Sequence, residues 1–263
     1  SLMTTTSYSS MLNAGIGMID ATRTMLNLWQ PGMSGVDLYK AALESGLFPN
    51  ITARRLQNFI KECFGPRYLV NKGGPSKILK SIESTFSSRE FNQLLFIYTC
   101  RESRILNDFV RDVYWGAYSS GRETISNEDA LLFVIRANQD GKTVKPWSEI
   151  TLSKVAGYLT ASCADFGLLE NGQRSIRKIL PFRIESRLGI LLAYDLHFSG
   201  HGDNSVLSHT DWGLFGLDRS DVLNEMKQLA LKGWFIIQSA GDVTRIGWQY
   251  QSMEEVIDAL NKR

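Results

Sequence analysis

The strongest constraint on the fold is a run of apolar residues at the spacing of an α-helix. Apolar side chains stand at i, i+3, i+4, i+7 and i+8, namely at Leu56, Phe59, Ile60, Cys63 and Phe64. Thr52 can cap the start of this helix, and Gly65-Pro66 is expected to end it. Such a stripe must be buried against other helices, so the first half of the chain is predicted to be a helical bundle.

A second helix is predicted immediately upstream. Ser34 followed three residues later by Asp37 has the form of a capping box, and the helix that it opens ends near Gly46. Two helices joined by a short turn are typical of a helix-turn-helix, whose second helix meets DNA. On that second helix the side chains facing away from the apolar stripe are Arg54, Asn58 and Lys61.

The second half of the chain alternates helices with short strands. A predicted helix stops at Phe166-Gly167, and Asn171-Gly172 is a strong signal for a two-residue hairpin turn. A basic strand is predicted over 174–184. A helix followed by a hairpin is the second half of a winged helix, so a first winged-helix-like unit is predicted here.

The same plan recurs toward the C-terminus. An apolar helical stripe begins near Ser220 and ends at Gly233, and strands over 234–238 and 243–250 flank a turn at Ala240-Gly241-Asp242. The predicted fold class is therefore mainly α (α+β): a helical bundle with a helix-turn-helix and two winged-helix-like units that carry short β-hairpins.

A chain of 263 residues can build one large core or two to three smaller ones. The stretch from Asp140 to Pro146 is the best candidate for a linker. Four segments are predicted, namely an N-terminal helix-turn-helix-like region (1–80), a central helical region (81–145) and two winged-helix-like units (146–200 and 201–263).

Composition favours a globular protein of the cytoplasm. The most apolar stretch, Leu188 to Leu196, is too short to cross a membrane and contains Asp195. Residues 1–10 contain neither a basic residue nor an apolar run, so a signal peptide is not expected. The cysteines are widely spaced within helical patterns and are predicted to be free thiols, namely Cys63, Cys100 and Cys163.

Charge is concentrated in blocks, although the net charge is only +2. Residues 51–80 contain seven basic residues and one acidic residue, and residues 171–187 contain five basic and one acidic. Residues 201–258 contain nine acidic and four basic residues, which makes that segment a poor surface for DNA. A solvated helix face would also account for such charges. The candidate nucleic-acid-binding residues are Arg54, Arg55, Asn58, Lys61, Arg67, Lys72, Lys77, Lys80, Arg174, Arg177, Lys178 and Arg183.

Signatures of catalysis and of cofactor binding are missing from the sequence. Gly15-Ile16-Gly17 lacks the third glycine of a dinucleotide fingerprint, and Lys72-Gly73-Gly74 lacks the ending of a phosphate loop. His197, His201 and His209 lie among aspartates in a Gly-rich stretch, but a polar loop is favoured over a metal site. We therefore expect no catalytic residues, no metal and no cofactor.

The chain resembles the BrxA family, the small component of the BREX bacteriophage-exclusion systems of bacteria. The resemblance rests on the order of Tyr8-Ser9-Ser10, Gly15, Gly32, Ser34, Thr52 to Arg55, Arg67, Asp108-Phe109, Tyr114-Trp115, Trp147, Asp165 to Leu169, Ala193-Tyr194, His197, His209 to Trp212, Leu214 to Leu217 and Ala240-Gly241. It implies a non-enzymatic, mainly helical DNA-binding protein with winged-helix-like units and a NusB-like part, which acts beside other BREX proteins.

Three functions remain open at this point. Double-stranded DNA binding, mostly through phosphates, is the leading hypothesis, and a NusB-like part would also suit RNA. Single-strand binding would need aromatic residues among the basic ones, and Tyr68 and Phe182 are the only candidates. The third hypothesis is a protein-interaction scaffold of the defence complex.

Overall fold

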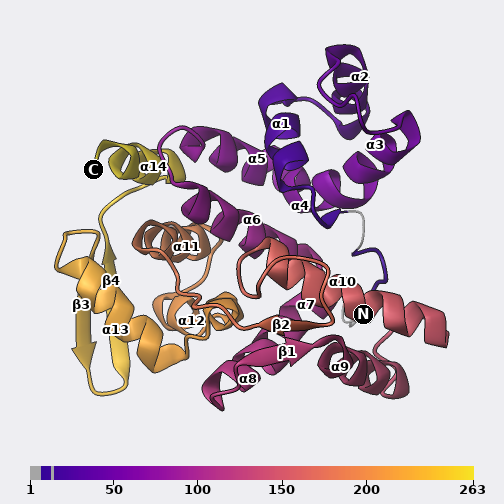
Figure 1. Ribbon diagram of the computed structural model, residues 1–263. Helices are drawn as coiled ribbons and strands as arrows, with labels where there is room; N and C mark the ends of the chain where they lie inside the picture. Colours follow the sequence, from indigo (N-terminus) through magenta and orange to yellow (C-terminus); the bar gives the residue numbers. More distant parts are fainter. Residues whose placement is uncertain (1–6, 13–14) are drawn as a thin grey trace. The chain divides into compact units, whose positions relative to one another are not determined.

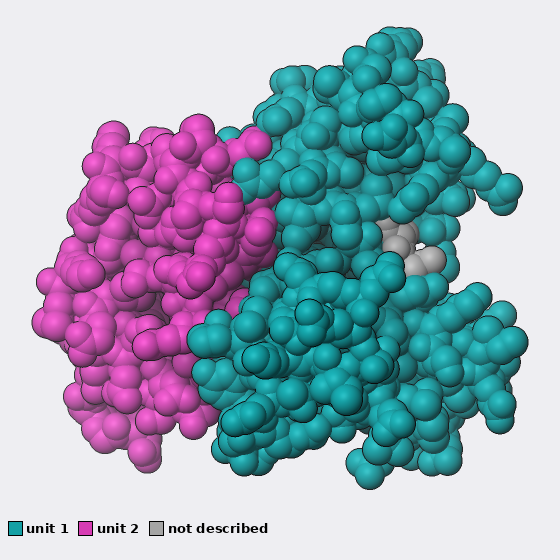
Figure 2. Space-filling view, in the orientation of Figure 1, with its two compact units in different colours: residues 1–80, 95–181 teal, residues 81–94, 182–263 magenta. Residues whose placement is uncertain are grey.

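The computed structural model describes residues 7–12 and 15–263, and its described part is mainly helical, with two small antiparallel sheets (Figure 1). This confirms the predicted mainly α (α+β) class. The contacts divide the chain into two compact units, one formed by 1–80 and 95–181 and the other by 81–94 and 182–263 (Figure 2). The four segments predicted from the sequence, with boundaries after residues 80, 145 and 200, stay a prediction.

Unit 1 contains most of the helices. Helix α5 (Val70–Ile82) and helix α6 (Ser88–Glu102) each contribute residues to both units. The other elements of unit 1 are α1 (Ile19–Leu28), α2 (Gly35–Ser45), α3 (Ala53–Phe59), the π-helix η2 (Ile60–Phe64), α4 (Gly65–Tyr68), α7 (Arg104–Asp108), the π-helix η3 (Phe109–Tyr114), α8 (Trp115–Ser119), β1 (Thr124–Ser126), α9 (Asn127–Gln139), α10 (Glu149–Asp165) and β2 (Ile176–Lys178).

The helix that begins at Ala53 does not end at Gly65-Pro66, contrary to the prediction. It widens into η2, where the Gly65 N–H donates to the carbonyl of Ile60, and then continues as α4. Pro66 lacks an N–H, and at the start of α4 that donor is not needed. A Cβ at position 65 would lie 2.9 Å from the Ile60 oxygen, so the glycine permits the wide turn.

A left-handed turn lies within α5 at residues 71–73. Asn71, Lys72 and Gly73 have φ values of 51°, 58° and 77°, and only glycine adopts this conformation without cost. A Cβ on Gly73 would also lie 2.6 Å from the ring of Trp29. The turn is therefore pressed against the end of α1.

The first predicted hairpin differs from the structure. Strand β2 is three residues long and pairs with β1, so that Ile125 lies opposite Arg177. The chain also approaches itself across 171–177, where the Glu170 N–H donates to the Lys178 carbonyl and the Leu180 N–H to the Leu168 carbonyl. The loop at Asn171-Gly172 is therefore longer than a two-residue turn. The strand that pairs with β2 is β1, which lies between α8 and α9.

Unit 2 places four helical elements before a hairpin. Its elements besides the shared helices are α11 (Ser186–Phe198), α12 (Asp203–Leu207), the 3-10 helix η4 (Thr210–Phe215), α13 (Arg219–Ala230), β3 (Phe235–Ala240), β4 (Val243–Trp248) and α14 (Met253–Lys262). Helix α11 packs against α12, α13 and α14, and α13 packs against β3. The second hairpin is confirmed, because Ala240 pairs with Val243 across the two-residue loop.

The histidines of unit 2 make packing and hydrogen-bonding contacts. His197 stacks on Trp248, with ring centroids 4.2 Å apart, and the Asp203 carboxylate accepts hydrogen bonds from the Trp248 indole and the Ile246 N–H. The Nδ1 of His209 accepts from the N–H of Asp211, and the ring of His201 meets that of His209 edge-on. In the ranges 7–12 and 15–263, no group of three or more His, Cys, Asp or Glu side chains is placed to hold a metal ion.

We expect His197 to make stability depend on pH. Burial lowers the pKa of His197 below its ordinary value, although the Asp203 carboxylate acts in the opposite direction. Because the unfolded chain then binds the proton more tightly, the contribution is present above the unfolded pKa of about 6.5 and is lost as the pH falls through the folded pKa. The variant His197→Phe keeps a ring against Trp248 and cannot titrate. Its melting temperature should fall less than that of the parent protein between about pH 7.5 and 5.5, whereas equal decreases would exclude His197 as the titrating group.

Candidate nucleic-acid interface

The helix pair α2 and α3 is built by local capping, as predicted. The Ser34 hydroxyl accepts from the Asp37 N–H and the Asp37 carboxylate accepts from the Ser34 N–H, each at 3.2 Å. These hydrogen bonds lower the pKa of Asp37. Gly46 ends α2 with a φ of 68°, and the Thr52 hydroxyl caps α3. The connection over 46–52 is longer than the short turn typical of a helix-turn-helix.

Helix α3 and the start of η2 present an exposed polar face. Arg54, Arg55, Asn58 and Lys61 are all exposed, while the apolar stripe on the opposite side is buried. Within the described part of the chain, neither arginine forms an ion pair, and nor does Lys61. Basic residues in the first turn of a helix are disfavoured by the helix dipole. The stability of the fold therefore does not explain why Arg54 and Arg55 stand in the first turn of α3, and their guanidinium groups are available to bind an anion.

Two further exposed cations follow on α5. Lys72 projects from the left-handed turn, and Lys77 lies one turn into the regular part of the helix. Lys80 is half-buried, and its Nζ donates to the carbonyl of Trp29 at 2.5 Å, at the C-terminus of α1. This bond gives Lys80 a structural role, because a cation is stabilised at the C-terminus of a helix.

Arg67 does not belong to the exposed surface. Its side chain is only 4% exposed, and its Nε lies 3.4 Å from the carboxylate of Glu102. A Cβ on Gly15 would lie 2.2 Å from the Arg67 guanidinium, so the glycine lets the backbone at position 15 lie against the Arg67 side chain. Arg67 cannot contact a phosphate in this conformation.

The second basic block is also divided by burial. Arg177 faces inward from β2, where it is 7% exposed and donates to the Glu170 carbonyl at 2.9 Å. Arg174 and Lys178 are exposed, and Arg174 lies 3.8 Å from the Glu170 carboxylate. Arg183 is exposed but belongs to unit 2. Of the predicted set, β2 and its loop therefore offer only Arg174 and Lys178 to a ligand.

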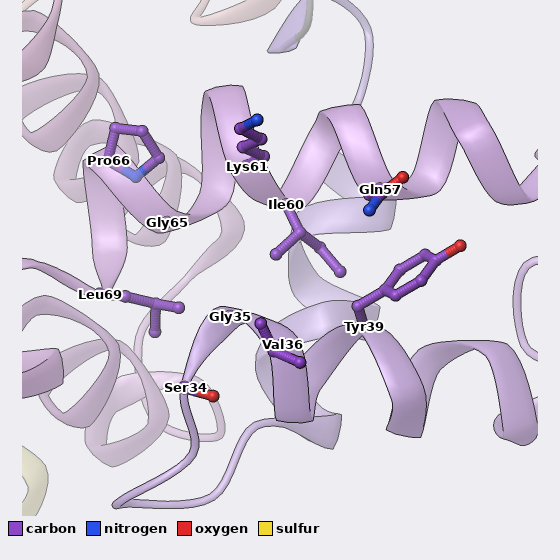
Figure 3. Close-up of a pocket in the computed structure, with 10 residues that line it drawn as sticks. All are labelled: Ser34, Gly35, Val36, Tyr39, Gln57, Ile60, Lys61, Gly65, Pro66 and Leu69. Carbon is purple, nitrogen blue, oxygen red and sulfur yellow. The ribbon is translucent and has the colours of Figure 1, made fainter.

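A groove of about 580 Å³ lies between α2 and the continuous rod formed by α3, η2 and α4 (Figure 3). Val36 and Tyr39 come from α2, and Ile60 and Leu69 come from the other wall. The remaining lining residues are Ser34, Gly35, Gln57, Lys61, Gly65 and Pro66.

The groove is not among the features predicted from the sequence, although a signal for it is present. Val36, Tyr39 and Leu43 stand at i, i+3 and i+7 on α2, outside the buried pair Leu38 and Ala42. They form a second apolar stripe, and a helix needs only one stripe to pack on its own core.

Free thiols, as predicted, occur at all three cysteine positions, and each is buried. Burial raises the pKa of Cys63 to about 11, so its thiol is neutral at physiological pH.

Among the residues that the structure describes, no helix combines the length and apolar character that a membrane crossing requires.

Comparison with known proteins identifies a matching family and a similar solved structure. The family model described as BrxA matches residues 6–194. No curated protein matches the chain. The crystal structure of an uncharacterized protein from Magnetospirillum magneticum superposes with a TM-score of 0.57 at 16% identity, covering 73% of this chain and 94% of that chain. At this identity the likeness concerns the fold alone.

Proposed function

The chain belongs to the BrxA family, and we propose that it serves a BREX bacteriophage-exclusion system by binding double-stranded DNA without catalysing a reaction. The family supports a role in phage defence and makes other BREX proteins plausible partners. The single observation that carries DNA binding is the set of exposed cations on α3 and η2 that form no ion pair in the described structure.

Phosphate contact is the role that suits these cations. Arginine forks bind phosphate oxygens in pairs, and such contacts fix a protein on DNA without reading its sequence. Arg54, Arg55 and Lys61 lie on one rod, with Lys72 and Lys77 on the helix that follows. Asn58 adds an amide that can donate to a phosphate or to a base edge. Binding should therefore tolerate changes of sequence.

Burial of the aromatic candidates favours duplex DNA over single strands. Tyr68 is 2% exposed and Phe182 is 6% exposed, the latter stacked on Phe215. Neither ring can stack on an unpaired base, which is the contact that single-strand binding uses most.

Unit 2 supplies a second candidate module. The three α-helices α11, α12 and α13, followed by the β3–β4 hairpin, have the order of a winged helix. The winged-helix assignment of this unit stays part of our proposal, as does the NusB-like assignment of the helical part. Unit 2 has more acidic than basic residues, so we assign the main phosphate contacts to the α3–η2–α4 rod and to the part of α5 that belongs to unit 1.

The proposal predicts a steep dependence of binding on salt. Five neutralised phosphates would give a slope of log K against log salt of about −4 to −5, at roughly −0.9 for each phosphate. Fluorescence anisotropy with duplex DNA over a range of salt concentrations measures this slope. A slope near zero would exclude phosphate contact as the source of binding.

The same titration separates the alternatives. Duplex DNA of scrambled sequence should bind about as well as the original duplex, and single strands and structured RNA should bind more weakly. Tighter binding to structured RNA would favour an RNA function, and no binding to any nucleic acid would favour the scaffold.

A further inference from the structure

We propose that the groove between α2 and the α3–η2–α4 rod docks an acidic amphipathic helix of a partner protein. The proposal goes beyond DNA binding and does not depend on it. It rests on the shape of the groove, on its apolar lining and on the sign of the charge at its wall.

The apolar surface here exceeds what the fold uses. Val36 is 66% exposed although it lines the groove, and Leu43, Leu47 and Val70, which lie on or next to the helices that form the two walls, are 46%, 54% and 43% exposed. Single exposed apolar residues are normal on a protein surface, but several of them on the helices that form an apolar groove are typical of an interaction site.

The shape of the groove suits a helix. Both of its walls are helical, and η2 widens the second wall next to Gly65, which has no side chain to fill the space. Gly35 likewise adds no side chain on the first wall. An amphipathic helix inserts side chains at i, i+3, i+4 and i+7 into such a groove.

The polar groups in the groove fit a small ligand less well. The Ser34 hydroxyl is used in the capping box of α2, and the Tyr39 hydroxyl donates to the carbonyl of Ala53. A small-molecule site needs several polar groups that converge on the ligand. Among the lining residues, Gln57 and Lys61 are the polar side chains without such an assignment.

Charge selects an acidic partner. Of the ten residues that line the groove, Lys61 carries a positive charge and the other nine are uncharged. Arg54 lies two turns before Lys61 on the same rod, and Lys40 lies one turn after Val36 on α2. A helix whose flanks carry carboxylates would be attracted to this rim, and a basic helix would be repelled.

Labelled synthetic peptides test the proposal with the full chain. One peptide carries leucines at i, i+3, i+4 and i+7 with glutamates elsewhere, a second replaces the glutamates by lysines, and a third has the acidic composition in scrambled order. The acidic amphipathic peptide should bind more tightly than the other two. Equal binding of all three, or binding of none, would overturn the proposal.

Two matched variants locate the binding site. Val36→Gln should weaken binding of the acidic peptide about tenfold, which corresponds to losing the burial of one valine side chain. Val144→Gln is the control, because Val144 is 67% exposed and lies outside the groove. An equal loss of affinity in both variants would contradict docking in the groove.

Two further readouts separate helix docking from DNA binding and from self-association. Val36→Gln should leave the affinity for duplex DNA unchanged, so that a failure of this proposal is distinguishable from a failure of DNA binding. If the parent protein is a dimer that Val36→Gln converts to a monomer in sedimentation, the occupant is a second copy of this chain and the partner-helix proposal is wrong.

Discussion

Reversing the charge of Arg54, Arg55 and Lys61 together is expected to weaken binding to duplex DNA by about a hundredfold. Each charge-assisted contact contributes about 1 kcal/mol or more, and three lost contacts correspond to about two decades in Kd. Each lost contact should also reduce the salt slope by about 1. Fluorescence anisotropy with one duplex measures both quantities.

The fold should survive this triple reversal. The three side chains are exposed and form no ion pair in the described part of the chain, and glutamate in the first turn of a helix is favoured by the helix dipole. The melting temperature should therefore stay within the scatter of surface substitutions. A large decrease in melting temperature would show that these residues hold the helix pair together.

A control for net charge comes from unit 1 itself. Lys142, Lys145 and Lys154 are exposed and lie outside the predicted set. Reversing them changes the net charge by the same amount and should affect DNA binding much less. If both triple variants weaken binding equally, the protein attracts DNA through its overall charge and α3 has no special role.

The second basic block needs its own variant. Reversing Arg174 and Lys178 tests the surface at β2, and Arg177 is left intact because it is buried. If this variant alone loses DNA binding, the helix pair α2 and α3 is better assigned as a docking surface for a partner. If neither block matters, the duplex hypothesis fails and the scaffold takes its place.

Local signals in the sequence predict local structure well. The capping box of Ser34 and Asp37 involves residues three apart, and the turn at Gly241 joins strands that are adjacent in the chain. Neither depends on what the rest of the molecule does, and both are confirmed. The pairing of β1 with β2 joins residues about fifty positions apart, and three-residue strands carry too little alternation to indicate such a partner.

The candidate site is less predictable, because burial is decided by tertiary packing. Arg67 continues the stripe of Ile60, Cys63 and Phe64 by one more turn, which places it in the core. The sequence conceals this because Gly65-Pro66 predicts the end of the helix. On β2, Ile176 points outward at 59% exposure while Arg177 points inward, the reverse of what hydropathy predicts. The pairing with β1 determines that orientation.

Removing the carboxylate of Glu102 is expected to destabilise the fold by about 3 kcal/mol. Arg67 would remain charged, because a guanidinium does not lose its proton in a protein. Its side chain is only 4% exposed, so the charge would be left in the core without the carboxylate that now lies 3.4 Å away. Glu102→Gln keeps the shape of the side chain and tests the charge alone. In a protein of this size the melting temperature should fall by about 6–12 °C.

The reciprocal variant should be tolerated better. Arg67→Met fills much of the same space without a charge, and the Glu102 carboxylate that it leaves behind is 31% exposed and can be hydrated. Combining Arg67→Met with Glu102→Gln should therefore recover much of the stability that Glu102→Gln loses, since no buried charge remains. Urea unfolding of the three variants measures this recovery.

If Arg67→Met destabilises as much as Glu102→Gln and the double variant shows no recovery, the two residues contribute through packing. If Arg67→Met instead abolishes DNA binding while the fold is intact, Arg67 belongs to the interface and must become exposed when DNA binds.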